Sequence, residues 1–330
     1  PVNLALRGAL TDLSACEGYG EAAKRFYKSA LVPFEFEGGV YALPETQTFP
    51  MLFVRTDIFD DLKLAVPRTW DDVLRLLPVI EKNNLDIGIE SDAMNSLTTF
   101  LYQYGARLYD DKGTKCVADS EEGIAAFKDF ITYFIDYEVP LTYNFVNRFR
   151  TGEIPIGITD YSAYNTLSVF APEIRGSWKM LPVPGVEKNG EIDRSVAGNV
   201  TGCVILKECK NPAGAWEFVR WWTNADTQLH FGKELESLLG VAARYTTANR
   251  EAVEDLAWSK ADYRNLLEQW EWARGNPEVP GGYFTSRHLN NAFRRAVYRK
   301  TENPRDILGE YVEIINQEIA SKRSEFGLDG

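Results

Sequence analysis

The sequence predicts an α/β protein built in more than one lobe, and three observations lead to this prediction. The chain has 330 residues, which is long for a single hydrophobic core. Strand-like and helix-like segments alternate over roughly the first two thirds of the chain, and the remainder is mostly helical. With 45% hydrophobic and 25% charged residues, the composition is that of ordinary globular proteins.

The predicted elements follow from hydrophobic periodicity and from capping signals. Glu17 to Leu31 contains apolar residues at helical spacing, and Thr69 can cap a helix whose first turn carries Asp71 and Asp72. Further helices are expected over 98–104, 120–137, 212–223, 226–237, 249–256, 260–273, 286–299 and 304–323. Further strands are expected over 86–89, 154–158 and 178–184, and residues 203–206 form a short apolar run.

The region from Gly38 to Phe59, GGVYALPETQTFPMLFVRTDIF, contains two apolar, strand-like runs, Val40–Leu43 and Met51–Val54. Four polar residues, Glu45–Thr48, separate these runs without an Asn-Gly or Asp-Gly hairpin signal. The two runs are therefore expected to belong to different lobes rather than to one hairpin, with the polar residues passing between the lobes.

Charge and composition exclude several classes of partner. A formal charge of −12 and an isoelectric point near 4.9 argue against nucleic acid. No apolar run approaches the length of about 20 residues that spans a bilayer. Two histidines without a Cys/His cluster give little basis for a metal site, and no cofactor is expected. Four scattered cysteines are too few for a disulfide framework; Cys203 and Cys209 are interpreted as free thiols, with a disulfide between them as the alternative.

Individual motifs give weak signals. Gly18 to Ala23 matches the GxGxxA pattern, but no buried strand precedes it, so dinucleotide binding is not predicted. Leu13–Cys16 resembles a lipoprotein cleavage box, but Arg7 and Asp12 interrupt the apolar stretch before it. A glycosidase-like pair of acids drawn from Glu45, Asp160, Glu234 and Glu236 stays open at this level, although solvated surface charge is the simpler interpretation.

Aromatic residues make up 13% of the chain, and several lie beside planar polar side chains. The clusters are 160–165 (DYSAYN), 269–272 (QWEW) and 281–287 (GGYFTSR). A flat apolar ring next to hydrogen-bonding side chains suits a sugar, because one face of a pyranose presents C–H groups and its rim presents hydroxyls. The simpler alternative is that these rings pack in the protein interior.

Several segments in a fixed order resemble the maltose-binding-protein-like family of extracellular solute-binding proteins, the carbohydrate receptors of ABC importers. Tyr41–Pro44, then Leu52–Phe59, then Pro67–Asp72 is similar to the family's progression YxLP, LxYRKDLF, PxTWdEl. Phe149–Ile158, Val196–Asn199, Asn211–Phe218 and Gly281–Val297 resemble later family segments, most closely those of the Gram-positive lipoprotein branch. The match covers essentially the whole chain.

The resemblance implies a two-lobe, periplasmic-binding-protein-like class II fold with hinge crossings and a helical C-terminal part. Residues 1–46 and 197–275 would form lobe 1, residues 47–196 lobe 2, and residues 276–330 helices at the cleft and on lobe 2. Family members begin with roughly a hundred further residues, so lobe 1 is expected to lack its N-terminal strands, as in an N-terminally truncated member.

The resemblance also implies a set of ligand-binding residues. Glu45, Thr46 and Gln47 would lie on the first crossing, with Gly198 and Asn199 on the returning one. Asp160, Tyr161 and Tyr164 would lie at the lip of lobe 2. Tyr283, Arg287 and Asn290 would line the site from the C-terminal helices, and Trp270 is a further, weaker candidate. No residue is expected to be catalytic or to bind a metal.

The implied function is binding of a carbohydrate, an oligosaccharide, in the cleft and its delivery to the permease subunits of an ABC transporter. The implied setting is extracellular, with the parent protein anchored as a lipoprotein and acting as a monomer. Two alternatives stay open: a carbohydrate-active hydrolase that uses cleft carboxylates, and a surface sugar sensor without a transport role.

Overall fold

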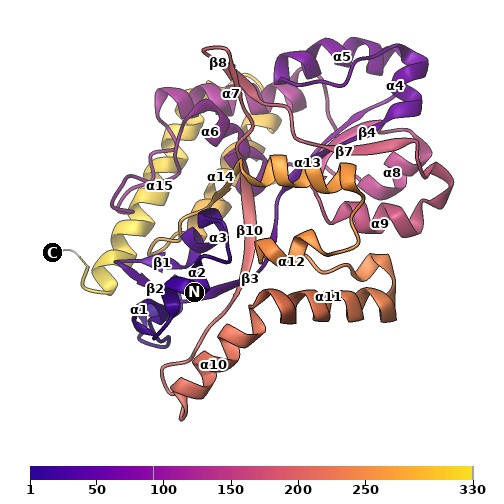
Figure 1. Cartoon of the computed structure of the whole chain (residues 1–330). Helices are drawn as coiled ribbons and strands as arrows, with labels where there is room; N and C mark the ends of the chain where they lie inside the picture. The colour runs from indigo at the N-terminus through magenta and orange to yellow at the C-terminus, as the bar shows by residue number, and fades with distance from the viewer. Residues whose placement is uncertain (92, 329–330) are drawn as a thin grey trace.

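The computed structural model describes residues 1–91 and 93–328 (Figure 1). The chain forms two main sheets, and the strands of one lie in the sequence between the strands of the other. Helices cover both sheets. The first sheet has the order β11–β10–β3 and the second the order β5–β6–β4–β7; β1–β2 and β8–β9 are separate hairpins. The hairpin strands are Glu35–Phe36, Gly39–Val40, Val186–Lys188 and Glu191–Asp193.

The three-stranded sheet is built around β10 (Val196–Cys203), which pairs antiparallel with β3 (Leu43–Thr48) and parallel with β11 (Ala273–Gly275). β3 and β10 run side by side through the middle of the molecule (Figure 1). The other edge of β3 hydrogen-bonds to the segment around Thr247. The register shifts opposite Pro44, which has no backbone N–H to donate to the ladder.

The four-stranded sheet has β4 (Pro50–Arg55) and β6 (Ile156–Asp160) in its centre. β4 is antiparallel to both β6 and β7 (Trp178–Leu181), and β5 (Ile87–Ile89) is parallel to β6. All six residues of β4 are buried. A strand buried on both faces needs no alternation of polar residues, which explains the continuous apolar run PMLFV.

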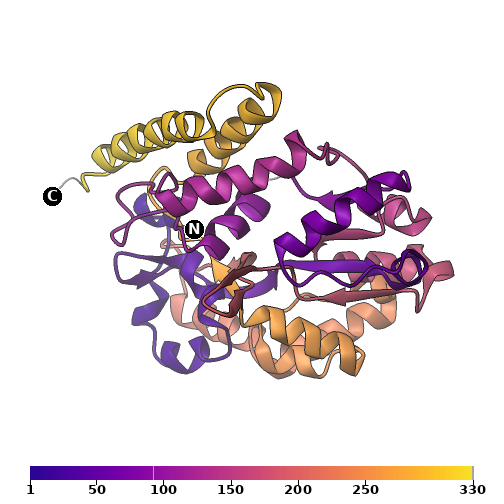
Figure 2. The same ribbon diagram turned by 90° about the horizontal axis from the view of Figure 1, so that it is seen from above.

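Helices cover both faces of this sheet. One face carries Leu52 and Val54, which belong to a hydrophobic cluster that also includes residues of α5 (Trp70–Lys82), α6 (Thr98–Tyr104), α7 (Glu121–Ile135), α14 (Tyr283–Tyr298) and α15 (Pro304–Glu325). The other, with Met51 and Phe53, packs against α8 (Phe145–Thr151), α9 (Ala163–Phe170) and α13 (Lys260–Trp270). Seen from above, α14 and α15 form an outer layer beside α7 (Figure 2).

The remaining elements lie mostly below the three-stranded sheet in Figure 1. The helices are α1 (Val2–Leu6), α2 (Tyr19–Ala23), α3 (Lys28–Leu31), α4 (Thr56–Leu62), α10 (Pro212–Trp222), α11 (Ala225–Leu239) and α12 (Arg250–Glu254), and α4 lies beside β4 instead. Short 3₁₀ turns span Leu13–Ala15, Val32–Phe34, Pro172–Ile174 and Val241–Ala243, and a π-helical turn, η3, spans Ala93–Leu97.

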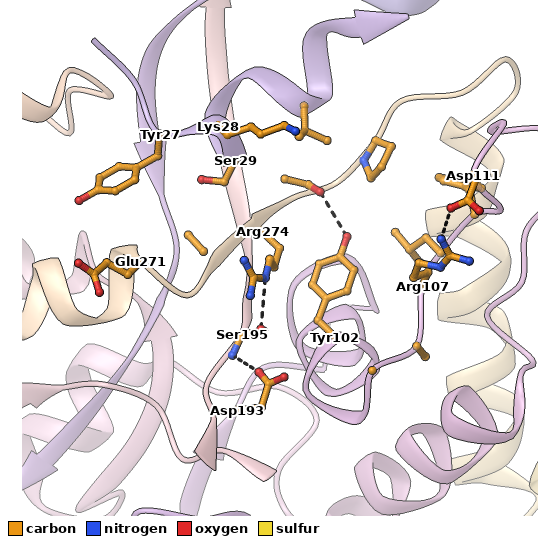
Figure 3. A pocket seen from close by; sticks show the side chains of 18 of the residues that line it. Tyr27, Lys28, Ser29, Tyr102, Arg107, Asp111, Asp193, Ser195, Glu271 and Arg274 are labelled. Carbon is orange, nitrogen blue, oxygen red and sulfur yellow. Dashed lines mark hydrogen bonds and ion pairs between the residues drawn. The ribbon is translucent and has the colours of Figure 1, made fainter. Parts of the chain in front are cut away.

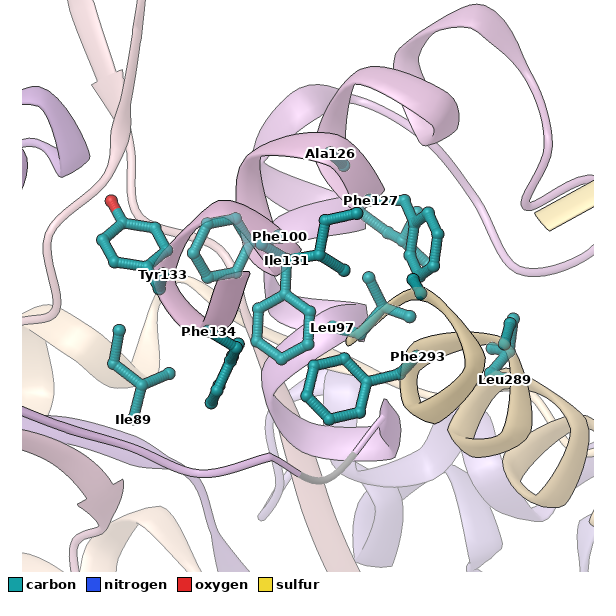
Figure 4. Packing of buried hydrophobic residues seen from close by; sticks show 14 of the residues in the cluster. Ile89, Leu97, Phe100, Ala126, Phe127, Ile131, Tyr133, Phe134, Leu289 and Phe293 are labelled. Carbon is teal, nitrogen blue, oxygen red and sulfur yellow. The ribbon is translucent and has the colours of Figure 1, made fainter. Parts of the chain in front are cut away.

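The main core lies between the four-stranded sheet and the C-terminal helices (Figure 4). Phe130 of α7 contacts Phe293 of α14 with ring centroids 5.2 Å apart, and Phe134 contacts the same ring at 4.9 Å. Leu289 and Phe293 point from α14 into this cluster. One face of α14 is therefore fixed against the rest of the molecule, which turns its opposite face outward.

Several predicted elements are confirmed. The strand-like runs on either side of residues 45–48 belong to different sheets and do not pair. Thr69 caps α5 through a capping box, because its hydroxyl accepts from the Asp72 N–H while the Asp72 carboxylate accepts from the Thr69 N–H. The five helices predicted after residue 225 correspond to α11 to α15, and the cysteines are free thiols.

The polar residues Glu45–Thr48 form most of β3, because β10 and the segment around Thr247 supply hydrogen-bond partners on both edges. One predicted helix is wrong in detail. The helix predicted over 17–31 breaks into α2 and α3 at Phe26 and Tyr27, whose rings pack into different clusters. The apolar run over 203–206 does not continue as a strand, because β10 ends at Cys203 and the Val204 side chain is exposed.

No helix in the described part of the chain combines the length and the apolar character needed to cross a membrane.

Candidate functional site

The two sheets are joined by β3 and β4, which a single residue, Phe49, separates. Successive side chains along this stretch point alternately to its two sides, without a break at Phe49. Gln47 and Phe49 point to one side, where Phe49 joins the cluster that holds Met51 and Phe53. Thr46 and Thr48 point to the other side.

The second set of side chains forms a polar surface that we name the crossing face: Thr46, Thr48, Asn199 and Thr201. Asn199 lies opposite Thr48 and Thr201 opposite Thr46 in the antiparallel ladder, so all four side chains share one face. The Thr46 and Thr201 hydroxyls are 2.6 Å apart and hydrogen-bond to each other. Asn199 and Thr201 are exposed, and the two threonines of β3 are half-buried.

Asp160 continues this surface at the end of the second sheet. It lies opposite Pro50, which has the same facing as Thr48, and its Oδ1 accepts from the Ser162 N–H at 2.9 Å. Glu45 has the opposite facing and accepts from the Trp222 indole at 2.8 Å. Because these two carboxylates lie on opposite faces of the crossing, they do not flank a common bond as a glycosidase pair would.

The buried side of the crossing holds three of the predicted site residues. The Trp270 indole N–H donates to Gln47 Oε1 at 2.8 Å, and the Tyr161 hydroxyl donates to the Gln47 carbonyl at 2.8 Å. All three side chains are buried. The ring of Phe49 lies between them, 5.0 Å from that of Tyr161 and 5.7 Å from that of Trp270. These residues form the packed base of the crossing rather than its polar surface.

Gly198 completes this base. A Cβ at this position would lie 3.3 Å from the Gln47 amide nitrogen and 3.5 Å from the Arg274 carbonyl oxygen. The missing side chain therefore lets Gln47 pack against β10. Burial and the neighbouring Asp160 raise the pKa of the Tyr161 hydroxyl well above its ordinary value, so this group stays a neutral donor.

Tyr164 lies apart from the crossing face. Its hydroxyl donates to Asp262 at 2.9 Å, and its ring lies 5.0 Å from that of Trp258. Burial, and secondly the Asp262 carboxylate, raise the pKa of Tyr164 to about 12. A cavity of about 360 Å³ opens here between α9 and α13, and Arg244 and Trp178 also line it.

The remaining predicted residues lie on the outward face of α14. Tyr283 is 52% exposed, and its ring lies 4.1 Å from that of Phe284. Arg287 and Asn290 line a hollow of about 410 Å³ with Ser91, Asn291 and Arg294. The turn η3, which begins two residues after Ser91, contacts both β10 and α14. It therefore lies between α14 and β10, the strand that carries Asn199 and Thr201.

A cavity of about 680 Å³ lies on the buried side of the crossing (Figure 3). Ser29, which accepts from the Gln47 amide at 3.3 Å, and Trp270 both line it. Several polar side chains that line it already have hydrogen-bond partners: Tyr102 donates to Asn276 at 2.6 Å, Arg274 to Ser195 at 3.3 Å, and Arg107 to Asp111.

Sequence reasoning missed Thr201, Ser91, Asn291 and Arg294. A signal for two of them was present, because Asn291 and Arg294 continue the helical spacing that begins at Tyr283 and Arg287. The facing of Thr48 and Thr201 depends on the pairing of β3 with β10, which lie about 150 residues apart in the chain. In the described residues, no group of three or more His, Cys, Asp or Glu side chains is arranged to hold a metal ion.

Comparison with known proteins gives one family and many similar folds. A family model for bacterial extracellular solute-binding protein matches residues 4–229. No curated protein sequence matches the chain significantly. The structure resembles the sugar-binding protein MalE of Xanthomonas citri, with a TM-score of 0.80, 16% identity, and coverage of 99% of this chain and 83% of that chain.

Two similar structures contain bound sugars. A solute-binding protein from Thermotoga lettingae, bound to α-D-tagatose, has a TM-score of 0.75 and 18% identity, with coverage of 96% of this chain and 82% of that chain. A substrate-binding protein from Listeria monocytogenes, in complex with cycloalternan, has a TM-score of 0.75 and 18% identity. The match covers 96% of this chain and 81% of that chain. At these identities the likeness concerns the fold.

Proposed function

Because the chain belongs to the family of bacterial extracellular solute-binding proteins, we propose that it binds a carbohydrate at the crossing face and delivers it to an ABC transporter permease. The observation that carries the proposal is the position of the crossing face: exposed hydroxyl and amide groups lie where the chain passes between two separately packed sheets. An oligosaccharide is the ligand we favour, and the similar protein from Listeria monocytogenes holds cycloalternan.

The chemistry of the crossing face supports a sugar. Threonine hydroxyls and the Asn199 amide can each donate and accept hydrogen bonds, as sugar hydroxyls do. Tyr283 offers an exposed ring that Phe284 supports from behind, and such a ring can cover the C–H face of a pyranose. We therefore assign direct ligand contact to Thr46, Thr48, Asp160, Asn199, Tyr283, Arg287 and Asn290.

The other predicted residues receive supporting roles in this proposal. Gln47, Tyr161 and Trp270 fix the strand that carries Thr46 and Thr48, and Gly198 makes room for Gln47. Glu45 and Tyr164 hydrogen-bond away from the crossing face, to Trp222 and Asp262. These contacts favour a structural role for both residues.

We further propose the division into lobe 1 (1–46 and 197–275), lobe 2 (47–196) and C-terminal helices (276–330). The two sheets support it, because β3 and β10 belong to one and β4 to the other. Ligand binding would rotate the two parts about the crossing strands, as in hinge closure of binding proteins. We propose that the chain acts as a monomer; attachment through a lipid anchor stays a prediction from the resemblance.

Titration calorimetry and tryptophan fluorescence with a panel of oligosaccharides test the proposal. We expect saturable binding of at least one sugar with a fluorescence change and without release of reducing ends. Asn199→Ala should weaken that binding several-fold, whereas Asn83→Ala, at the exposed end of α5, should leave it unchanged. Absence of binding across the panel would refute the proposal. Reducing-end release that disappears in Asp160→Asn would favour a hydrolase instead.

A further inference from the structure

α14 presents two chemically different faces. Its inner face carries Leu289 and Phe293, which pack into the main core (Figure 4). Its outward face carries two tyrosines, two arginines and two asparagines at helical spacing: Tyr283, Arg287, Asn290, Asn291, Arg294 and Tyr298. Tyr283 is 52% and Tyr298 is 74% exposed, although large aromatic rings usually find cover.

Two hollows adjoin along this face. The first, of about 410 Å³, is lined by Ser91, Arg287, Asn290, Asn291 and Arg294. The second, of about 560 Å³, shares Asn291 and Arg294 with the first and continues to Tyr298 and to Tyr311 of α15. Together they form one groove, which we name the α14 groove. Tyr298 lines its second hollow, and Tyr283 lies on the same outward face of α14, about 22 Å away along the helix at about 1.5 Å per residue.

The arginines of the groove differ in their partners. Arg295 pairs with Glu310 and Glu302, and Arg299 pairs with Glu302, so these charges are compensated. Arg287 lies over the ring of Phe284 at 5.5 Å, and neither it nor Arg294 forms an ion pair with any residue that the structure describes. Among the residues that the structure describes, the groove thus presents two arginines without an ion-pair partner, on a protein whose net charge is −12.

We propose that the α14 groove selects carboxylate-bearing sugars, so that the transported ligand is an acidic oligosaccharide. This inference rests on the proposed function and names the chemical class of its ligand. Guanidinium groups bind carboxylates through paired N–H donors, and Arg287 and Arg294 lie two helical turns apart on one face. Asparagine amides between them suit sugar hydroxyls, and the exposed tyrosines suit sugar rings.

The placement of charge also predicts an orientation. Asp160, at the end of the crossing face, would repel a carboxylate, whereas Arg287 and Arg294 would attract it. The neutral hydroxyls of the sugar would therefore lie on the crossing face and its acidic units along α14. A neutral sugar has no carboxylate and would therefore lack the attraction to Arg287 and Arg294.

The test compares ligands that differ only in charge. Trimers of galacturonic, glucuronic and mannuronic acid are titrated calorimetrically into the full chain, each beside its neutral methyl ester. We expect at least one free acid to bind about tenfold more tightly than its ester, with a preference that shrinks as salt is added. Arg294→Gln and Arg287→Gln should each reduce the ratio of acid to ester affinity toward one.

A matched control removes one positive charge elsewhere. Arg264→Gln, on the exposed surface of α13 and outside the groove, should leave the ratio unchanged. Circular dichroism verifies that every variant is folded. Esters or neutral oligosaccharides that bind as tightly as the acids would overturn the acidic-ligand inference while the proposed function stands. If neither acids nor neutral sugars bind, the inference and the proposed function both fail.

Discussion

The two sides of the crossing strand β3 are built from similar residue types but do different work. Gln47 is polar like its neighbours Thr46 and Thr48, yet it is fully buried and holds Trp270, while the threonines line a solvent-facing surface. The difference arises from strand alternation and from what each side meets: α13 and Tyr161 on one, solvent on the other. Residue type alone therefore does not identify a binding position in this segment.

The strongest test of this comparison removes the largest side chain on the buried side. Trp270→Ala should lower the free energy of unfolding by about 3–5 kcal/mol, because it leaves a cavity beside Phe49 and removes the donor to Gln47. Urea unfolding followed by circular dichroism measures it. Trp221→Ala, at a tryptophan that is 53% exposed on α10, is the matched control and should cost far less. Equal costs would contradict the assignment of sides.

A smaller effect is expected from the hydrogen bond itself. Gln47→Leu keeps the volume but leaves the buried Trp270 indole N–H without its acceptor, which should cost about 1–3 kcal/mol. Trp270→Phe removes that donor. In a double-mutant cycle, Gln47→Leu should therefore cost less in the Trp270→Phe background than alone. Additive costs would show that the bond contributes nothing.

The next prediction extends the comparison to the far end of β4, where a charge is buried. The Arg55 side chain is 9% exposed, pairs with Asp57 at 2.6 Å, and donates to the Phe149 carbonyl at 3.0 Å. The hydrogen bond from Arg55 to Asp57 lowers the pKa of the Asp57 carboxyl. Burial acts in the opposite direction, but the pKa stays below its usual range. The ionised Asp57 carboxylate therefore stabilises the fold at pH values above the ordinary carboxyl pKa of about 4. This stabilisation is lost as the pH falls through the pKa that Asp57 has in the folded protein.

Asp57→Asn should accordingly lower stability near neutral pH and make the loss on acidification shallower than in the unmodified chain. Urea midpoints at neutral and acidic pH measure both slopes. Asp61→Asn removes an exposed carboxylate of the same helix and serves as the control. If Asp57→Asn left the loss of stability on acidification unchanged, the pairing of Asp57 with Arg55 would not contribute to the pH dependence of stability.

The smallest stability effect should come from the crossing face. Thr48→Val and Asn199→Ala alter side chains in contact with solvent, so each should change the free energy of unfolding by less than about 0.5 kcal/mol. Both should nevertheless weaken sugar binding several-fold in calorimetry. A stability loss as large as that of Gln47→Leu would mean that these residues are structural too.

Parts of this arrangement could be predicted from the sequence. The lack of a hairpin signature between the runs around Leu43 and Leu52 indicated that they belong to different sheets, and helical periodicity located the C-terminal helices. Alternation along the strand PETQT divides its side chains into two sets. The sequence does not show which set is buried, because burial depends on packing against α13 and β10, which lie far away in the chain. Gln47 and Trp270 were therefore expected at the ligand.

The α14 residues illustrate the opposite case. Tyr283 and Arg287 were identified through the resemblance, and extending their spacing by one and two turns reaches Asn291 and Arg294. The pairing of Arg295 and Arg299 with Glu302 could not be predicted in this way, because it depends on how α15 folds back against α14. Which arginines keep a free charge is therefore a property of the tertiary structure.

The single residue between β3 and β4 has a consequence for how this protein can vary. Inserting or deleting one residue at Phe49 would exchange the facings of all side chains on one side of the link relative to the other. Gln47 would then point to solvent, or Met51 and Phe53 would leave their cluster. Homologous chains can lengthen their surface loops freely, but we expect the spacing between Gln47 and Met51 to stay fixed in length, whatever residues occupy it.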